Sequence, residues 1–198
     1  LGLNSADGRN KTHHSWQPAH TIALLRYLAS HKLRFVIGGF ELGNEPRSEK
    51  YGFRLTGAEL GRDIVTLRQI VRETFGHENE PLLVGPDQDQ DQDCIVPHTT
   101  APCIPCFLDW CWRDTRSCIE TAHPALSAIT FHYYPLKEGL PYNGSRLLMQ
   151  PALLDKVQER AAPYIKLASS GSKRLPVWLG EGASAGHGGI DNVSNAFE

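Results

Sequence analysis

The sequence has no long hydrophobic run and no excess of either charge. No apolar stretch approaches the roughly 20 residues of a membrane-spanning helix, and no signal peptide is visible. The 198 residues include 20 basic and 22 acidic ones, with no run of Lys and Arg, so no nucleic-acid partner is expected. Internal repeats and interdomain linkers are also missing. With 40% hydrophobic residues, the chain is expected to form one globular unit with a sizeable core.

Cysteine is scarce, and its five copies lie in one short window, at positions 94, 103, 106, 111 and 118. An odd number leaves at least one thiol unpaired, or paired outside this sequence. Cys103 and Cys106 form a C-x-x-C pair, but zinc would need two further ligands and no second matched pair is present, so no metal is expected. A disulfide in a secreted loop is the favoured interpretation. A reduced pair and sequence from a retained intron are the alternatives.

Two apolar stretches end in a glutamate. The first is FVIGGFELGNEP at residues 35–46, where Pro46 prevents continuation and places Asn44 and Glu45 at the C-terminal end of a predicted buried parallel strand. The second is LPVWLGE at residues 175–181, which ends in Glu181. An α/β barrel carries its catalytic groups at this end of its strands. The two stretches therefore predict a site of paired carboxylates.

Helices and further strands alternate with these two stretches. Thr56 and Glu59 form a capping box that opens a helix, and Gly76 is expected to end it as a left-handed cap. Strands are predicted at 81–86 and 128–134, and helices at 22–29, at 107–120 and from Pro151, the last bent at Pro163. The inward face predicted for that last helix consists of Leu154, Val157, Ala161, Ile165 and Ala168. This alternation predicts a parallel sheet with right-handed crossovers.

One segment does not fit the alternation. Residues 87–93 alternate Asp and Gln, and a proline-bearing run follows to Pro105. Low-complexity acidic segments cannot bury enough apolar surface to fold, so we predict a disordered insertion at 87–106 inside a single domain spanning residues 1–198.

Three motifs in order resemble the heparanase and β-glucuronidase family 79 of glycoside hydrolases. They are ELGNEP at 41–46, FHYY at 131–134 and VWLGE at 177–181, and LGLN at 1–4 is similar to the end of that family's third strand. The resemblance implies an α/β fold that is part of a (β/α)8 TIM barrel, roughly its third to seventh strands. A complete barrel needs about 250 residues, so the chain is expected to be a fragment of one catalytic domain.

The resemblance also implies roles for individual residues. Glu45 would be the general acid/base and Glu181 the nucleophile of a retaining glycosidase. Asn44 would bind the sugar 2-hydroxyl, and Tyr133 would orient the nucleophile or contact the sugar. His132 and Tyr134 are weaker candidates, because neighbours on a strand point to opposite faces.

A glycine-rich turn after Glu181 is the feature most relevant to specificity. In the family, backbone amides of such a turn bind the carboxylate of a uronic acid. The sequence here is Gly-His-Gly-Gly at 186–189, whereas heparanase carries Tyr followed by three glycines. The amides of His187, Gly188 and Gly189 are expected to bind substrate, and His187 would add a titratable cation.

The function implied by the resemblance is hydrolysis of β-linked glucuronic acid in a polysaccharide or glycoprotein glycan, without a cofactor. A neutral β-glucosidase or endoglucanase of the same clan and a non-catalytic glycan-binding protein are the alternatives. Sequons begin at Asn10, Asn143 and Asn192, and three of them favour secretion and glycosylation. An extracellular, lysosomal or vacuolar location is expected, with peripheral association with a membrane or the extracellular matrix.

Overall fold

A computed structural model describes residues 1–6, 9–10, 12, 14–31, 33–46, 55–89, 104–134 and 149–183. Its centre is a parallel sheet of five strands that are hydrogen-bonded in chain order, β1-β2-β3-β4-β5. The strands are β1 (Gly2–Leu3), β2 (Gly39–Leu42), β3 (Leu82–Asp89), β4 (Ala128–Tyr133) and β5 (Val177–Gly182). Consecutive parallel strands joined by helices are the arrangement of a (β/α)8 barrel, so the predicted fold class is confirmed.

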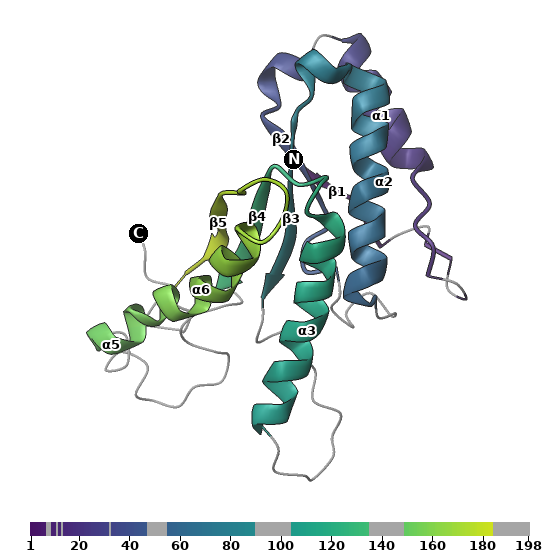
Figure 1. The fold of residues 1–198 in the computed structure, drawn as a ribbon. Helices are drawn as coiled ribbons and strands as arrows, with labels where there is room; N and C mark the ends of the chain where they lie inside the picture. The colour runs from purple at the N-terminus through teal and green to yellow at the C-terminus, as the bar shows by residue number, and fades with distance from the viewer. Residues whose placement is uncertain are drawn as a thin grey trace, which may run out of the picture.

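Within the described residues, five α-helices connect or flank these strands (Figure 1). They are α1 (Ala19–Ser30), α2 (Gly57–Phe75), α3 (Ile104–Ala122), α5 (Pro151–Leu154) and α6 (Lys156–Ala168). Two 3-10 turns, η1 (Leu33–Val36) and η3 (His77–Asn79), precede β2 and β3. In Figure 1, α2 and α3 stand side by side along the sheet, while α6 packs on β4 and β5. No helix of the described residues is long and apolar enough to cross a membrane.

Helix α2 forms where its capping box predicts. The Thr56 hydroxyl accepts a hydrogen bond from the backbone N–H of Glu59 at 3.2 Å, and the Glu59 carboxylate accepts one from the backbone N–H of Thr56 at 2.7 Å. Gly76 ends the helix at φ 76°, although its ψ of 155° is not that of the predicted left-handed cap. Both ends of α2 therefore lie where the sequence places them.

The core lies between the sheet and its helices. Fully buried side chains from the strands meet fully buried side chains from α2 and α6, namely Phe40, Leu83, Ile129, Leu60, Ile64, Leu67 and Tyr164. The Tyr164 ring stacks on Phe131 with centroids 5.0 Å apart and meets the edge of Trp112 at 5.2 Å. These aromatic contacts join α3, β4 and α6 into one packed unit.

A buried arginine ties the opposite end of the sheet together. Arg68, in α2, donates to the carbonyl of Ala125 at 2.7 Å, to Ser127 Oγ at 2.8 Å and to Glu80 Oε1 at 2.6 Å. Because these partners precede β3 and β4, Arg68 holds α2 against the N-terminal ends of the strands. The carboxyl ends are left for the side chains described below.

The first predicted strand is shorter than expected. Residues 33–36 form η1 instead, and Phe35 and Val36 are 74% and 78% exposed, so the prediction of one buried strand from residue 35 is wrong. Strand β2 begins at Gly39, where a Cβ would lie 2.9 Å from both the Cβ and the carbonyl oxygen of Leu82. Only a glycine permits that close approach of β2 to β3.

Two further predictions need correction. Residues 87–89 belong to β3, and Asp87 and Gln88 are buried, so the predicted disordered insertion does not include them. Its end overlaps α3, which begins at Ile104, while residues 90–103 lie outside the described part of the chain. Ile165 is 49% exposed rather than inward, because Tyr164, Leu167 and Ala168 form the buried face of α6.

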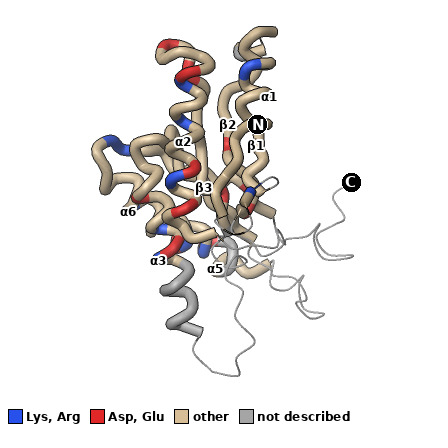
Figure 2. The backbone as a smooth tube through the Cα atoms, turned by 90° about the vertical axis from the view of Figure 1, so that its right-hand side faces the viewer, with Lys and Arg blue, Asp and Glu red and all other residues tan. Residues whose placement is uncertain are grey.

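The mixture of charges seen in the sequence extends over the surface. Figure 2 shows Lys and Arg interspersed with Asp and Glu along the described chain, including helices α2, α3 and α6.

Candidate active site

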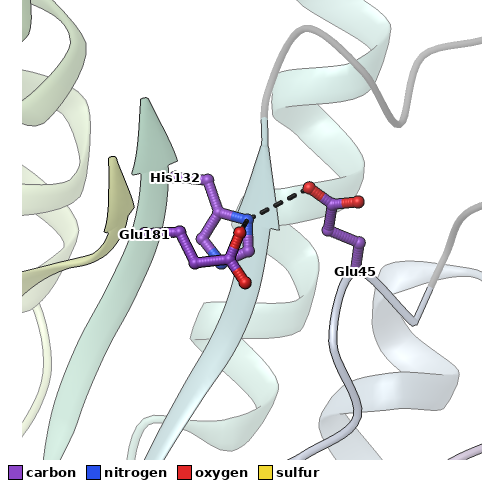
Figure 3. Close-up of side chains that lie close together, drawn as sticks. All are labelled: Glu45, His132 and Glu181. Carbon is purple, nitrogen blue, oxygen red and sulfur yellow. Dashed lines mark hydrogen bonds and ion pairs between the residues drawn. The ribbon is translucent and has the colours of Figure 1, made fainter. Parts of the chain in front are cut away.

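The two predicted catalytic glutamates converge on one histidine (Figure 3). Glu45 follows β2, Glu181 lies in β5, and His132 lies between them in β4. His132 Nδ1 is 3.1 Å from Glu45 Oε1 and 3.5 Å from Glu181 Oε2. One oxygen of each carboxylate and a nitrogen of the ring all lie within 4.8 Å of one another. The parallel sheet thus brings together two carboxylates that are far apart in the sequence.

A tyrosine holds the second glutamate. Tyr134 Oη donates a hydrogen bond to Glu181 Oε2 at 2.6 Å. The sequence predicts that Tyr133 orients the nucleophile or contacts the sugar, but the structure places Tyr134 against Glu181, and Tyr133 packs against the hydrophobic core. Side chains alternate along a strand, so Thr130, His132 and Tyr134 share the face that carries the site and Tyr133 points the other way.

Behind the histidine lies a second pair of carboxyl groups. His132 Nε2 is 2.5 Å from Asp87 Oδ1, and the backbone N–H of Asp87 donates to Thr130 Oγ1 at 3.0 Å. Thr130 in turn donates to Glu41 Oε1 at 3.2 Å. A continuous set of hydrogen bonds therefore runs from Glu45 through His132 and Asp87 to Thr130 and Glu41.

The backbone at this edge of the sheet adopts an uncommon conformation. Glu45 and Asp87 have φ of 46° and 56°, in the left-handed backbone region that residues other than glycine rarely adopt. Such conformations cost about 1–3 kcal/mol each and persist where the surroundings hold them. The two residues hold each other, because the N–H of Glu45 donates to the carbonyl of Asp87 at 3.1 Å. Nearby Gly43, at φ 81°, lies so close to Ser5 that a side chain would clash.

The crowding of acids has opposite effects on two neighbouring groups. Burial lowers the pKa of His132, but hydrogen bonds to Asp87 and Glu45 and the charges of Asp87 and Glu181 outweigh it and raise that pKa to about 10. Burial and the charge of Asp87 raise the pKa of Glu41 to about 7, although the hydrogen bond from Thr130 lowers it. At neutral pH His132 is therefore an imidazolium, and Glu41 titrates.

An open pocket of about 360 Å³ lies beside these groups. Its walls include residues 2–6 at the end of β1, together with Glu41, Gly43, Asn44, Asp87 and Glu181. Asn44 is exposed and lines this pocket, which is compatible with its predicted contact to a ligand. His187, Gly188 and Gly189, the predicted carboxylate-binding turn, lie outside the described residues.

Comparison with known proteins identifies the family. The sequence model of the family described as "Glycosyl hydrolase family 79, N-terminal domain" matches residues 1–198. The chain belongs to glycosyl hydrolase family 79. The resemblance carried by the three sequence motifs is thereby confirmed.

Relatives within family 79 are distant in sequence but match along most of this chain. Heparanase-like protein 3 of Arabidopsis thaliana is 25% identical over 203 residues, covering 100% of this chain and 34% of that protein. Heparanase of Gallus gallus is 27% identical over 191 residues, covering 92% and 31%. Inactive heparanase-2 of Homo sapiens is 21% identical over 196 residues, covering 96% and 28%. The chain spans about a third of the length of these curated relatives.

Glu45, His132 and Glu181 are spaced as ligands of a metal ion could be, but the histidine is already engaged. Each ring nitrogen contacts a carboxylate, and a pKa of about 10 keeps both nitrogens protonated at neutral pH. A doubly protonated imidazole has no lone pair for a metal. In this structure, both ring nitrogens of His132 are thus engaged by carboxylates rather than open to a metal.

The sequence motifs do not point to two of the residues that hold the catalytic candidates, and they rank a third below its neighbour. Asp87 is predicted to lie in an acidic insertion and Glu41 in a strand, while Tyr134 is a weaker candidate than Tyr133. A signal for Tyr134 is present in the sequence, because Thr130, His132 and Tyr134 occupy alternate positions of one strand and so lie on the same face. Asp87 gave a weaker signal, as the first carboxylate after the apolar run of β3.

Proposed function

We propose that the protein containing this chain is a retaining glycoside hydrolase that cleaves β-linked glucuronic acid in a polysaccharide or glycoprotein glycan. The observation that carries the proposal is the convergence of Glu45 and Glu181, with carboxylate oxygens within 4.8 Å of each other. Retaining enzymes hold their carboxyl groups about 5–5.5 Å apart, whereas inverting enzymes leave about 6.5–9.5 Å for a water molecule. An approach of one oxygen from each carboxylate to within 4.8 Å is compatible with the retaining spacing, which is measured between the whole carboxyl groups.

The chemistry proceeds in two displacements. A Glu181 oxygen attacks the anomeric carbon, the bond to the leaving oxygen breaks, and the proton of Glu45 passes to that oxygen. Glu45, now a carboxylate, takes a proton from water, which attacks the anomeric carbon and releases Glu181. Tyr134 and His132 hold the attacking carboxylate in place, since both contact Glu181 Oε2.

Substrate selection in this proposal belongs to residues around the pocket. Asn44 binds the 2-hydroxyl of the sugar, a contact that strengthens in the transition state. The amides of His187, Gly188 and Gly189 bind the uronate, because successive backbone N–H groups form an anion site. The proposed setting is extracellular or lysosomal, where such glycans occur.

The test uses the full-length protein and an aryl β-glucuronide. We expect Glu181→Gln to abolish turnover while binding survives, and NMR of the first sugar released by the parent enzyme to show the β anomer. Glu120→Gln is the matched control, because Glu120 is an exposed glutamate paired with Arg116 on α3, away from the site. Release of the α anomer, or activity of Glu181→Gln within about tenfold of the parent, would contradict the retaining assignment.

Specificity for the uronate is measured by comparing the glucuronide with the matching glucoside. Gly188→Val is expected to weaken the glucuronide more, because only that substrate loses a charge-assisted hydrogen bond. A parent enzyme that prefers the glucoside would favour the neutral glycosidase instead.

A non-catalytic glycan-binding protein is the second candidate, because one relative is named Inactive heparanase-2. Glycan binding by the full-length protein without turnover of either aryl glycoside would identify it.

A further inference from the structure

Asp87 contacts both the candidate acid/base and the histidine beside it. Its Oδ1 accepts a hydrogen bond from His132 Nε2 at 2.5 Å, and its backbone carbonyl accepts one from the N–H of Glu45 at 3.1 Å. Its backbone N–H donates to Thr130. The Asp87 side chain is only 5% exposed and the His132 side chain is fully buried, so water does not compete for their contact.

The contact with Asp87 leaves one ring N–H for the two catalytic candidates. His132 Nδ1 lies 3.1 Å from Glu45 Oε1 and 3.5 Å from Glu181 Oε2, so a single donor faces both carboxylates. Figure 3 shows the ring between them. If the ring rotated about the Cβ–Cγ bond of His132, Nδ1 would lose its contacts with both carboxylates.

The proposed reaction moves negative charge across this ring. Before the first displacement Glu181 is a carboxylate and Glu45 carries a proton. After it, Glu181 is a neutral ester of the sugar and Glu45 is the carboxylate. One positive charge placed between them stabilises both states, and it does so without rearrangement during the reaction.

We propose that Asp87 is a positioning residue that fixes the His132 ring between Glu45 and Glu181, so that one N–H serves whichever of them carries the negative charge. This role rests on the proposed glycosidase function. Asp87 borders the pocket, but its side chain is only 5% exposed, and its effect on the reaction passes through other groups. Asp87 acts through the imidazole and through the backbone of Glu45.

The charged groups around the ring come from every strand beside it. Glu41 and Glu45 approach from β2 and its end, Asp87 from β3 and Glu181 from β5, and each favours the protonated ring. Among the groups that raise the pKa of His132, the hydrogen bond to Asp87 is the largest contributor. Replacing that one carboxylate by an amide of the same shape should therefore lower the pKa of the ring.

The kinetic test is Asp87→Asn in the full-length protein, with kcat and KM for an aryl β-glucuronide measured between about pH 5 and 10. We expect kcat to fall about 10- to 100-fold with little change in KM. The alkaline limb of the profile should move about one to three pH units lower, since the ring loses its proton earlier. Asp114→Asn is the matched control, because Asp114 accepts a hydrogen bond from Gly57 at the start of α2 and does not contact His132. It should lower stability and leave the alkaline limb in place.

NMR of protein labelled at histidine gives a readout that does not require turnover. With His132 assigned by comparison with His132→Gln, its ring should stay protonated to about pH 9 in the parent and titrate one to three units lower in Asp87→Asn. An unchanged titration, or an unshifted alkaline limb, would overturn the positioning role. If Asp87→Asn shifts the titration of His132 but the parent protein hydrolyses no glycoside, the anchoring of His132 would be supported and the proposed function refuted.

Discussion

At the scale of single residues, the site is a set of carboxyl groups whose charges are controlled by their neighbours. Glu45, Asp87 and Glu181 surround one imidazolium, and Glu41 lies behind them beside Thr130. Glu45 and Asp87 contact opposite ring nitrogens of His132, Glu181 also accepts from Tyr134, and Glu41 accepts from Thr130. The same functional group is thus prepared for different tasks.

Tyr134→Phe tests the contact with the candidate nucleophile. The variant removes the hydroxyl that donates to Glu181 Oε2 at 2.6 Å. Hydrogen bonds to charged groups contribute about 1.5–3 kcal/mol, so kcat/KM should fall about 10- to 100-fold. Tyr133→Phe is the comparison, and its loss should be smaller because Tyr133 packs on the core. An equal or greater loss for Tyr133→Phe would return the orienting role to that residue.

Glu41→Gln tests the raised carboxyl pKa through stability. Burial and the charge of Asp87 raise the pKa of Glu41 from 4.5 to about 7, so the folded protein holds this proton more tightly than the unfolded chain between those pH values. Ionisation of Glu41 therefore destabilises the fold as the pH rises through that window. The Glu41 side chain hydrogen-bonds to Asp87. Glutamine cannot ionise, and its amide can donate to Asp87 in the same way.

The melting temperature of Glu41→Gln relative to the parent should thus rise between about pH 5 and 7 and then level off. Solvent screening at this partly exposed group limits the gain to about 1 kcal/mol, or about 2–4 °C. Glu78→Gln, at an exposed glutamate in η3, should show no such rise. A constant difference across the pH range would mean that folding does not raise the pKa of Glu41.

At the scale of elements, two glycines let α2 and α3 approach closely. A Cβ on Gly61 would lie 2.6 Å from Thr121 Cβ and 2.9 Å from the carbonyl of Cys118, and one on Gly57 would clash with the backbone of Asp114. The helices therefore meet with almost no side chain between them at these two points. This contact fixes the position of α2 against α3.

Gly61→Ala should destabilise the protein by about 1–3 kcal/mol, because the added methyl group overpacks the contact. Alanine favours helix formation, so a loss of stability would report the packing rather than helix propensity. Gly38→Ala is the control, since nothing lies within 4 Å of a Cβ there. Chemical denaturation of both variants measures the difference, and a more stable Gly61→Ala would show that α3 can move away.

Local sequence signals predict which helices and strands are present better than they predict the residues at which these begin and end. The capping box of Thr56 and Glu59 located the start of α2, because both of its hydrogen bonds are made within four residues. The exposed turn at 33–36 was missed because its apolar residues look like a strand. The predicted strand at 81–86 ends before β3 does, since Asp87 is buried against partners from distant parts of the chain, His132 among them.

In the candidate site, the sequence predicts the two glutamates at strand ends better than it predicts the residues that support them. Glu45 and Glu181 follow from strand ends, which are local features of the sequence. The supporting residues depend on which face of each strand looks into the site. Tyr133 and Tyr134 are adjacent on the strand and therefore point to opposite faces. Which face carries the site is set by the packing of the sheet, and in the structure it is the face of Tyr134.

At the scale of the whole molecule, the balance of charges bears on the substrate. The sequence carries 20 basic and 22 acidic residues, and the described pocket is lined by three carboxylates. Binding a heavily sulfated chain requires clusters of Lys and Arg. The described residues place none of these side chains on the pocket wall.

We therefore expect a preference for unsulfated or sparsely sulfated glucuronides. Acids at the site repel sulfate groups within about 8–10 Å, the screening length at physiological salt. The measurement compares hydrolysis of an unsulfated glucuronide with that of highly sulfated heparan as salt rises from about 50 to 300 mM. Faster cleavage of the sulfated chain, falling steeply with salt, would contradict the expectation.

The distribution of the site over β2, β3, β4 and β5 has a consequence for folding. A competitive inhibitor that touches Glu45 and Glu181 together ties β2 to β5 across the two strands between them, and it finds no such partner in the unfolded chain. At 100 times its dissociation constant it would add about 2.7 kcal/mol to the stability of the folded state. Inhibitors of this site would thus also act as pharmacological chaperones, rescuing variants whose helices or strands pack poorly while they pass through the cell's quality control.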